Sequence, residues 1–184
     1  MTEKQKKSLL QVARKVIEAA VVGKPVSQFE SEDSFFLQHL GCFVTIHNGG
    51  RLRGCIGNFQ PNQPLLDTIR EMGVAATRDS RFYADPVTVR ELPEIDVEIS
   101  VLSPLEKTDD PLSLELGTHG IYIKRGSACG CFLPQVATET GWSKEEFLSN
   151  CCGGKAGLKP DAWRDPTTEV FFFTADVFGE NELA

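Results

Sequence analysis

The amino-acid sequence predicts a domain of the α+β class, in which an antiparallel sheet is flanked by helices, and three observations support this prediction. The chain has 184 residues, of which 41% are apolar and 24% charged, as in an ordinary soluble protein. Segments with helical periodicity stand near the N-terminus and after residue 63. Strand-like segments come in pairs around tight turns, which is typical of β-hairpins.

Three segments are predicted to be helices: 5–22, 64–78 and 135–152. The first has apolar side chains at the helical period, and Thr2 and Gln5 have the spacing of a capping box. A proline opens the second, where its missing N–H costs nothing. All three are short enough to be helices of a globular domain, and no apolar run approaches the roughly 20 residues of a membrane span. We therefore expect no membrane segment.

The predicted strands include two hairpins, one around Asn48-Gly49-Gly50 and one around Gly126-Ser127. Residues 95–102 alternate strictly between apolar and polar, which predicts a strand with one buried face. Residues 168–178 contain a continuous apolar run, which predicts a central strand covered on both faces. The predicted strands are 42–47, 51–58, 95–102, 119–126, 128–134 and 168–178.

The strand order has a consequence for the domain organisation. A C-terminal strand in the middle of the first sheet would require the chain to return to that sheet. We therefore expect a larger subdomain of about 1–103 plus 167–184, and a smaller inserted α+β subdomain of about 104–166.

The charge is distributed unevenly along the chain, whose net charge is −7. Residues 1–24 carry a net charge of +4, whereas the remaining residues hold 13 basic and 24 acidic groups, a net charge of −11. An acidic body repels phosphate backbones, so we expect no nucleic-acid partner. The stretch 51–90 is an exception, with six Arg, no Lys and four acids. These arginines could recognise carboxylate or phosphate groups, or could be scattered surface residues.

Six cysteines, at positions 42, 55, 129, 131, 151 and 152, raise the question of the redox compartment. The N-terminal segment is charged among its apolar residues and does not have the pattern of a secretory signal. We therefore expect reduced thiols and a cytoplasmic location.

The densest motif is Leu52-Arg53-Gly54-Cys55-Ile56-Gly57. In an extended chain Leu52 and Ile56 would share one face, and Arg53 and Cys55 the other. The glycines are typical of a bulge or of a close approach by another backbone. An arginine beside a cysteine favours the nucleophilic thiolate. The alternative is a small packed cysteine, with Arg53 ion-paired to a carboxylate such as Glu98.

This motif closely resembles the signature hexapeptide of the AMMECR domain family, which is protein A of the AmmeMemoRadiSam system. The resemblance extends over nearly the whole chain. Its further matches are Asp79-Ser80-Arg81-Phe82, Glu91-Leu92-Pro93, Glu98-Ile99-Ser100-Val101-Leu102-Ser103-Pro104, His119-Gly120, Leu133-Pro134-Gln135-Val136-Ala137, Gly141-Trp142, Glu146-Phe147-Leu148, Lys155-Ala156-Gly157-Leu158 and Phe173-Thr174-Ala175.

The resemblance implies an α+β fold of two unequal subdomains, with both termini in the larger one and the hexapeptide facing a cleft between them. It also implies an association with a Memo-like protein and a radical SAM enzyme, and it carries no assigned reaction. The candidate cleft or binding residues are the hexapeptide, Asp79, Arg81, Glu98, Ser100 and Gln135.

Several of these residues have two interpretations. Glu98 could be a general base or could orient Arg53, and Ser100 shares its polar strand face. Asp79 and Arg81 could clamp the mouth of the cleft or cap the preceding helix.

The sequence departs from the family pattern at Gly126–Cys131 and Cys151–Gly154, where cysteine and glycine crowd together. The C-x₂₋₄-C spacing of zinc sites is absent, so we predict no metal, and packing or an adventitious reactive thiol is favoured for these cysteines. The chain lacks the CxxxCxxC, GxxxxGK[ST] and GxGxxG motifs, and its three histidines have no paired metal spacing. We therefore predict no cofactor.

Two function hypotheses follow. The first is a binding or accessory module that holds a protein or other large substrate for partner enzymes. The second is a cysteine-dependent enzyme with Cys55 as nucleophile and Arg53 as its activator. The first leads, because the sequence offers no histidine base for Cys55.

Overall fold

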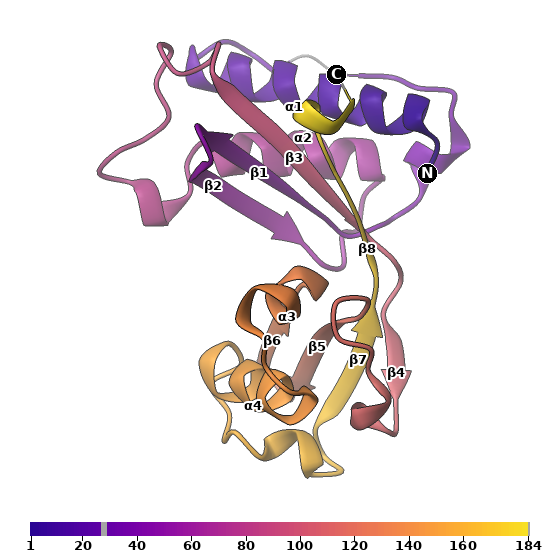
Figure 1. The fold of residues 1–184 in the computed structure, drawn as a ribbon. Coiled ribbons are helices and arrows are strands. Elements are labelled where there is room, and N and C mark those ends of the chain that lie inside the picture. Colours follow the sequence, from indigo (N-terminus) through magenta and orange to yellow (C-terminus); the bar gives the residue numbers. More distant parts are fainter. Residues whose placement is uncertain (27–28, 184) are drawn as a thin grey trace. The chain divides into compact units, whose positions relative to one another are not determined.

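The structure, a computed structural model, describes residues 1–26 and 29–183, and the chain in it divides into two compact units. The first unit comprises Met1–Leu102 and Asp176–Ala184, and the second comprises Ser103–Ala175. Each contains one four-stranded antiparallel sheet together with helices (Figure 1), so the predicted α+β class is confirmed. That a cleft separates two subdomains stays a prediction.

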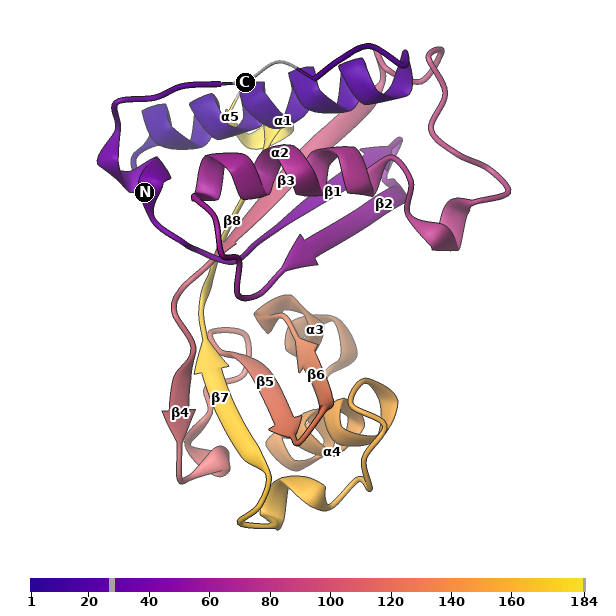
Figure 2. The same ribbon diagram turned by 180° about the vertical axis from the view of Figure 1, so that it is seen from behind.

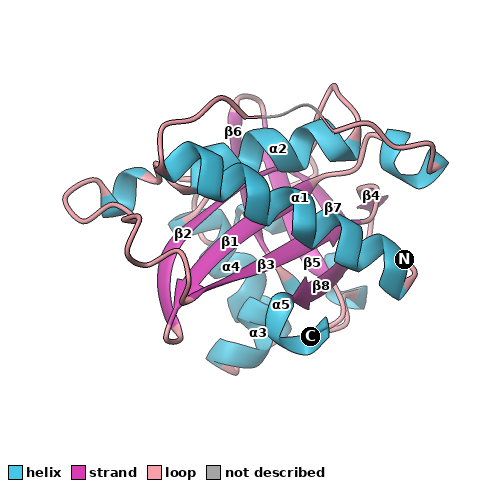
Figure 3. Ribbon diagram, turned by 90° about the horizontal axis from the view of Figure 1, so that it is seen from above, coloured by secondary structure: helices cyan, strands magenta, loops and turns pink. Residues whose placement is uncertain are grey.

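In the first unit the strand order is β2-β1-β3-β8, so that β2 forms one edge of the sheet. β1 pairs antiparallel with both β2 and β3. Helices α1 and α2 lie side by side across one face of this sheet (Figure 3), and a short α5 follows β8. The bounds of these elements are α1 Glu3–Val21, β1 Cys42–Asn48, β2 Arg51–Asn58, α2 Leu65–Ala76, β3 Ile95–Leu102, β8 Ala175–Gly179 and α5 Glu180–Leu183.

Local sequence signals account for the start of α1 and for the first hairpin. Thr2 and Gln5 form the predicted capping box, in which each side chain accepts a hydrogen bond from the other residue's backbone N–H. Gly49 and Gly50 both have positive φ, 56° and 78°, a conformation that favours glycine. The predicted β1–β2 hairpin is confirmed.

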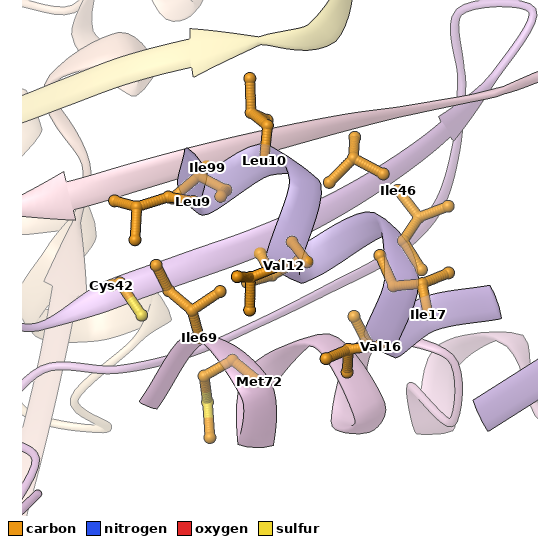
Figure 4. Packing of buried hydrophobic residues seen from close by; sticks show 14 of the residues in the cluster. Leu9, Leu10, Val12, Val16, Ile17, Cys42, Ile46, Ile69, Met72 and Ile99 are labelled. Carbon is orange, nitrogen blue, oxygen red and sulfur yellow. The ribbon is translucent and has the colours of Figure 1, made fainter. Parts of the chain in front are cut away.

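The core of the first unit lies between the sheet and the two helices (Figure 4). Leu9 and Val16 of α1, Ile69 of α2, Ile46 of β1 and Ile99 of β3 are fully buried there. Burial of a side chain of this size stabilises the fold by about 1.5–3 kcal/mol. The two helices therefore cover one face of the sheet. The outer edge of β2 and its opposite face lie outside this core.

The second unit has the strand order β4-β7-β5-β6, with every neighbouring pair antiparallel. Helices α3 and α4 pack against β5 and β6, and Phe147 and Leu148 of α4 are fully buried. The bounds are β4 Glu106–Thr108, β5 Gly120–Arg125, β6 Ala128–Phe132, α3 Pro134–Thr140, α4 Lys144–Gly154 and β7 Glu169–Phe173.

The single C-terminal strand predicted over 168–178 is wrong, because Thr174 divides this segment into β7 and β8. Val170 packs in the core of the second unit, whereas Phe178 packs in the core of the first. Because β7 and β8 follow each other almost directly, their apolar residues form one run in the sequence. This run resembles a single buried strand, although its two halves pack in different cores. The division between the units accordingly falls after Ala175, and not near residue 166.

The helix predicted over 135–152 is also two helices. Gly141 ends α3 in the left-handed conformation, with φ 67°, and Ser143 then caps α4 through a second capping box. Among the residues that the structure describes, no helix is both long and apolar enough to cross a membrane.

Candidate functional site

The hexapeptide 52–57 forms most of β2, and the strand is irregular at Arg53. Ile46 of β1 lies opposite Gly54, whereas His47 lies opposite Leu52, so Arg53 is the extra residue of a β-bulge. Because His47 and Val44 lie on opposite faces of β1, their partners Leu52 and Ile56 do so too. The predicted shared face of Leu52 and Ile56 is therefore wrong, and the bulge is the reason.

Both glycines of the hexapeptide lie against other parts of the first unit. A Cβ atom at Gly54 would stand 2.1 Å from the carbonyl oxygen of Ala76, at the end of α2. A Cβ atom at Gly57 would stand 2.3 Å from the ring of Phe43. Both glycines therefore allow the close approach that the sequence predicts. Gly54 lets β2 lie close to α2, and Gly57 lets it lie close to β1.

Arg53 is buried, with 3% of its side chain exposed, and it binds the loop of residues 79–94, called the 79–94 loop below. Its Nε donates to Glu91 Oε1 at 2.8 Å and its Nη1 donates to Asp85 Oδ2 at 2.9 Å. Its Nη2 also donates to the carbonyl oxygen of Pro86 at 3.2 Å. The carboxylate partners of Arg53 are therefore Asp85 and Glu91. The sequence had suggested Glu98 as an example of such a partner.

Glu91 is held as a carboxylate by this arrangement. The hydrogen bond from Arg53 is the main cause that lowers the pKa of Glu91 to about 2, and the backbone N–H and hydroxyl of Thr88 reinforce it. The guanidinium charge is thus compensated by two carboxylates of the protein itself.

Asp79 and Arg81 bind the backbone of Cys55 at the outer edge of β2. Asp79 Oδ2 accepts a hydrogen bond from the Cys55 N–H at 3.0 Å, and Arg81 Nη2 donates to the Cys55 carbonyl oxygen at 3.1 Å. The two side chains also form an ion pair of 2.6 Å. Together they satisfy the outward-facing N–H and C=O of Cys55, with which an additional strand would otherwise pair at this position.

The Asp79 carboxyl is 2% exposed and also caps the following 3₁₀ turn by accepting from the Arg81 N–H. The Arg81 side chain is the main cause that lowers the pKa of Asp79 to about 2. Asp79 therefore caps the turn that follows it. One alternative from the sequence was a cap on the preceding helix, which Asp79 does not form. The role of these two residues at a cleft stays a prediction.

The thiol of Cys55 is half-buried and lies on the face of the sheet opposite the two helices. The Thr45 hydroxyl donates a hydrogen bond to Cys55 Sγ at 3.2 Å. In the register of the sheet, Cys55, Thr45 and Glu98 form one row across β2, β1 and β3. Glu98 therefore lies two strands, roughly 10 Å, from Cys55.

The remaining predicted residues are dispersed. Ser100 is buried at 2% exposure, in the row of Phe43 and Gly57. Gln135 lies on α3 of the second unit, and its side-chain oxygen is buried with no hydrogen-bond partner among the described residues. The first unit thus brings together the hexapeptide, Asp79 and Arg81, whereas Gln135 belongs to the second unit.

A cavity of about 810 Å³ adjoins β2 on the side of α2. Ile56, Val74 and Ala75 supply apolar lining, and the side chains of Arg70 and Arg78 supply charge. Arg70 is ion-paired with Asp67 at 2.9 Å. The volume lies within the range of ligand-binding pockets in proteins.

Sequence reasoning missed three residues of this site, Thr45, Asp85 and Glu91. The turn alone would have placed Val44 opposite Cys55, and it is the bulge at Arg53 that brings Thr45 there, so Thr45 could not be identified from the hairpin. Glu91 is within one of the family matches, but nothing local connects it to Arg53. Asp85 carried no signal beyond its place in an arginine-rich stretch.

Of the four cysteines of the second unit, Cys151 and Cys152 pack in its core, Cys131 is half-buried and Cys129 is exposed. Cys151 and Cys152 are fully buried in its core, and burial raises the pKa of both thiols. Burial also raises the pKa of Cys131 to about 11. Within residues 1–26 and 29–183, no group of three or more His, Cys, Asp or Glu side chains is arranged to hold a metal ion.

Comparison with known proteins gives a consistent family. The AMMECR1 family model matches residues 10–178. A protein of Methanothermobacter thermautotrophicus is 44% identical over 95% of this chain and 94% of its own length. Protein MJ0810 of Methanocaldococcus jannaschii is 40% identical over 92% of this chain and 87% of its own length.

One solved structure is also similar, that of the uncharacterised protein PH0010 from Pyrococcus horikoshii. It superimposes with a TM-score of 0.83 at 35% identity, covering 94% of this chain and 89% of that one.

Proposed function

Because the chain belongs to the AMMECR1 family, we propose that it is a binding or accessory module, whose surface around β2 holds a protein or other large substrate. The observation that carries this proposal is the way in which the side chain of Arg53 is bound within the first unit. Its guanidinium is buried and compensated by Asp85 and Glu91. A charge neutralised in this way fixes the 79–94 loop and is poorly suited to activate a thiol.

The clamp on the backbone of Cys55 supports the same proposal. Asp79 and Arg81 hold the edge of β2 in one conformation. A fixed surface loses little conformational entropy when a partner binds. Beside this edge, the cavity with Ile56 and Ala75 offers apolar area for a segment of the substrate.

The proposed partners are a Memo-like protein and a radical SAM enzyme, as the family resemblance implies. The proposed location is the cytoplasm, where the six free thiols would stay reduced. The chain itself would supply recognition, and the partners would supply the chemistry.

The proposal is tested by titrating the chain against each purified partner from the same organism in a calorimeter. Ala75→Glu, which projects a charge into the cavity, should weaken association about tenfold. The matched control Ala20→Glu, on α1 outside the cavity, should leave it unchanged. Cys55→Ser should also bind normally. If neither partner binds the wild-type chain, or if Ala75→Glu binds as well as Ala20→Glu, the proposal is wrong.

The alternative is a cysteine-dependent enzyme, and one observation favours it. Cys55 is half-exposed, unlike the buried Cys42, and the Arg81 guanidinium lies against its carbonyl oxygen. Alkylation of Cys55 in mildly acidic buffer, followed by mass spectrometry, separates the two functions. A binding module should react slowly. Rapid alkylation that disappears in Arg81→Ala would favour the enzyme.

A further inference from the structure

The outer flank of α2 lies along the cavity beside β2. In Figure 2, α2 lies in front of the first sheet and is seen from its outer side. Glu71, Val74, Ala75 and Arg78 all line the cavity, and they follow one another at intervals of three, one and three positions. Side chains at this spacing share one face of a helix. They form a single row along the cavity, called the 71–78 row below.

The row continues past the end of α2. The C-cap Thr77 keeps helical dihedral angles, and the Arg78 N–H donates to the Ala75 carbonyl oxygen at 2.9 Å. At the rise of an α-helix, Glu71 and Arg78 stand about 10 Å apart along the axis. Val74 and Ala75 are half-buried between them. The row therefore consists of an acid, two apolar side chains and a base.

Among the residues that the structure describes, neither end of the row is neutralised by an oppositely charged side chain. Glu71 accepts a hydrogen bond from the side-chain amide of Gln63 at 2.6 Å, but an amide carries no charge. The Arg78 side chain has no hydrogen bond or ion pair within residues 1–26 and 29–183. Glu71 and Arg78 are both exposed, so their charges are accessible to a bound segment.

The other charged side chains of the cavity are compensated within the first unit. Arg70 forms an ion pair with Asp67 at 2.9 Å, and Asp79 forms one with Arg81 at 2.6 Å. The cavity is therefore not uniformly acidic or basic. Within the described part of the chain, its unpaired charges are one negative and one positive, at opposite ends of the 71–78 row.

The spacing of these two charges indicates the conformation of a complementary segment. Such a segment has a base and an acid about 10 Å apart on one face, with apolar side chains between them. In an α-helix, residues seven positions apart are separated by about 10 Å and lie nearly on the same face. In a strand, residues on the same face are two or four positions apart, which is about 7 or 13 Å. A helix therefore matches the row, and a strand does not.

We propose that the substrate segment held beside β2 is an amphipathic helix that has an acid and a base seven positions apart and two apolar residues between them. Its base pairs with Glu71, its acid pairs with Arg78, and its apolar side chains pack on Val74 and Ala75. A helix bound in a groove through residues at this spacing is a recurring mode of peptide recognition. This inference rests on the proposed function, and it names the class of segment that the cavity holds.

Three synthetic peptides of about 16 residues test this inference, each rich in alanine so that it forms a helix on its own. The mixed peptide has a Glu and a Lys seven positions apart, and two leucines at the third and fourth positions after the Glu. The two-acid peptide has Glu at both charged positions, and the two-base peptide has Lys at both. Each peptide carries a fluorescent label, and its anisotropy reports binding to the whole chain.

The wild-type chain should bind the mixed peptide at least about tenfold more tightly than the other two, because each of those places like charges together at one end of the row. Glu71→Arg makes both ends basic and should shift the preference to the two-acid peptide. Arg78→Glu should shift it to the two-base peptide. The matched control Glu18→Arg, on α1 outside the cavity, should keep the preference for the mixed peptide. An unchanged melting temperature confirms that each variant is folded.

Three results would overturn the inference. In the first, the three peptides bind with equal affinity. In the second, a mixed peptide with a central proline, which interrupts the helix, binds as well as the original. In the third, sedimentation shows that the wild-type chain is a dimer and Glu71→Arg a monomer, which would assign the row to a second copy of the chain.

The calorimetric test of the proposed function can fail independently of this one. If a partner binds the wild-type chain and Ala75→Glu weakens it, but no peptide binds, the proposed function stands and the helical class of segment is wrong. If the mixed peptide binds with the expected dependence on Glu71 and Arg78 but neither partner binds, the helical class stands and the proposed partners are wrong.

Discussion

Each of the two attachments of the 79–94 loop to β2 contains an ion pair, and the two ion pairs are built in opposite ways. At one attachment the arginine is buried, since 3% of the Arg53 side chain is exposed, and its partner Asp85 is mostly exposed. At the other attachment the acid is buried, since 2% of the Asp79 side chain is exposed, and its partner Arg81 is 57% exposed. The first pair joins the strand to the loop directly, whereas the second lies within the loop and binds the strand through the backbone of Cys55.

The difference shows which group is structural at each attachment. A buried charge is strongly destabilising when its partner is removed, whereas an exposed charge is compensated by water. Loss of Asp85 and Glu91 would therefore leave the Arg53 charge buried without a carboxylate, and loss of Arg81 would leave the Asp79 charge buried beside no cation. The exposed members, Asp85 and Arg81, remain available to other groups.

The largest expected effect is that of the double variant Asp85→Asn/Glu91→Gln, which leaves the buried charge of Arg53 without its two carboxylate partners. We expect the free energy of unfolding, measured in urea, to fall by about 3–5 kcal/mol. Arg53→Lys keeps the charge but loses the planar fork, and should fall by less. A double variant as stable as the wild type would mean that this attachment contributes nothing.

A smaller effect is expected on acidification. The pKa of Glu91 and of Asp79 is lowered to about 2 in the folded chain, chiefly by Arg53 and Arg81 respectively. Carboxyl groups of an unfolded chain titrate near pH 4. The contributions of Glu91 and Asp79 to the free energy of unfolding are therefore complete above about pH 5, and they are lost as the pH falls from about 4 to about 2. Each should amount to about 2 kcal/mol.

Urea unfolding at a series of pH values measures this loss. Glu91→Gln and Asp79→Asn should each have a flatter dependence of stability on pH in this acidic range, because each lacks one titrating group. If both variants follow the wild-type curve, the lowered pKa values do not arise at these carboxyl groups.

The smallest expected effect is that of Arg81→Lys. The lysine retains a charge beside Asp79, and most of the arginine that it replaces is solvent-exposed, so stability should fall by about 1 kcal/mol or less. The same urea measurement compares it directly with Arg53→Lys. Equal losses in the two lysine variants would show that burial is not what distinguishes the two attachments.

How well the sequence predicts these features depends on how far apart in the chain the interacting residues lie. The first hairpin follows from Asn48-Gly49-Gly50, and the start of α1 follows from Thr2 and Gln5, because their partners lie within a few residues. The partners of Arg53 lie 32 and 38 positions further along the chain, in an irregular loop. No periodicity links them, so the sequence offered Glu98 instead.

The same limit explains the error near the C-terminus. Hydrophobicity predicts that a residue is buried but does not say in which core, and Val170 and Phe178 are buried in different ones. The family resemblance had named Asp79 and Arg81 as candidate residues of a cleft or binding site, which stays a prediction. The resemblance could not show that they act on the backbone of Cys55.

The chain crosses between the two units at places that are joined by hydrogen bonds. The Ser103 N–H donates to the Thr174 carbonyl oxygen at 2.9 Å, and the Thr174 N–H donates to Ser103 Oγ at 2.9 Å. These bonds close a loop of about 70 residues between β3 and β8, which are neighbours in the first sheet. Closing so long a flexible loop costs about 4 kcal/mol of chain entropy. If the second unit folds first, it delivers its two ends already joined, and β8 then meets β3 as if a short turn connected them.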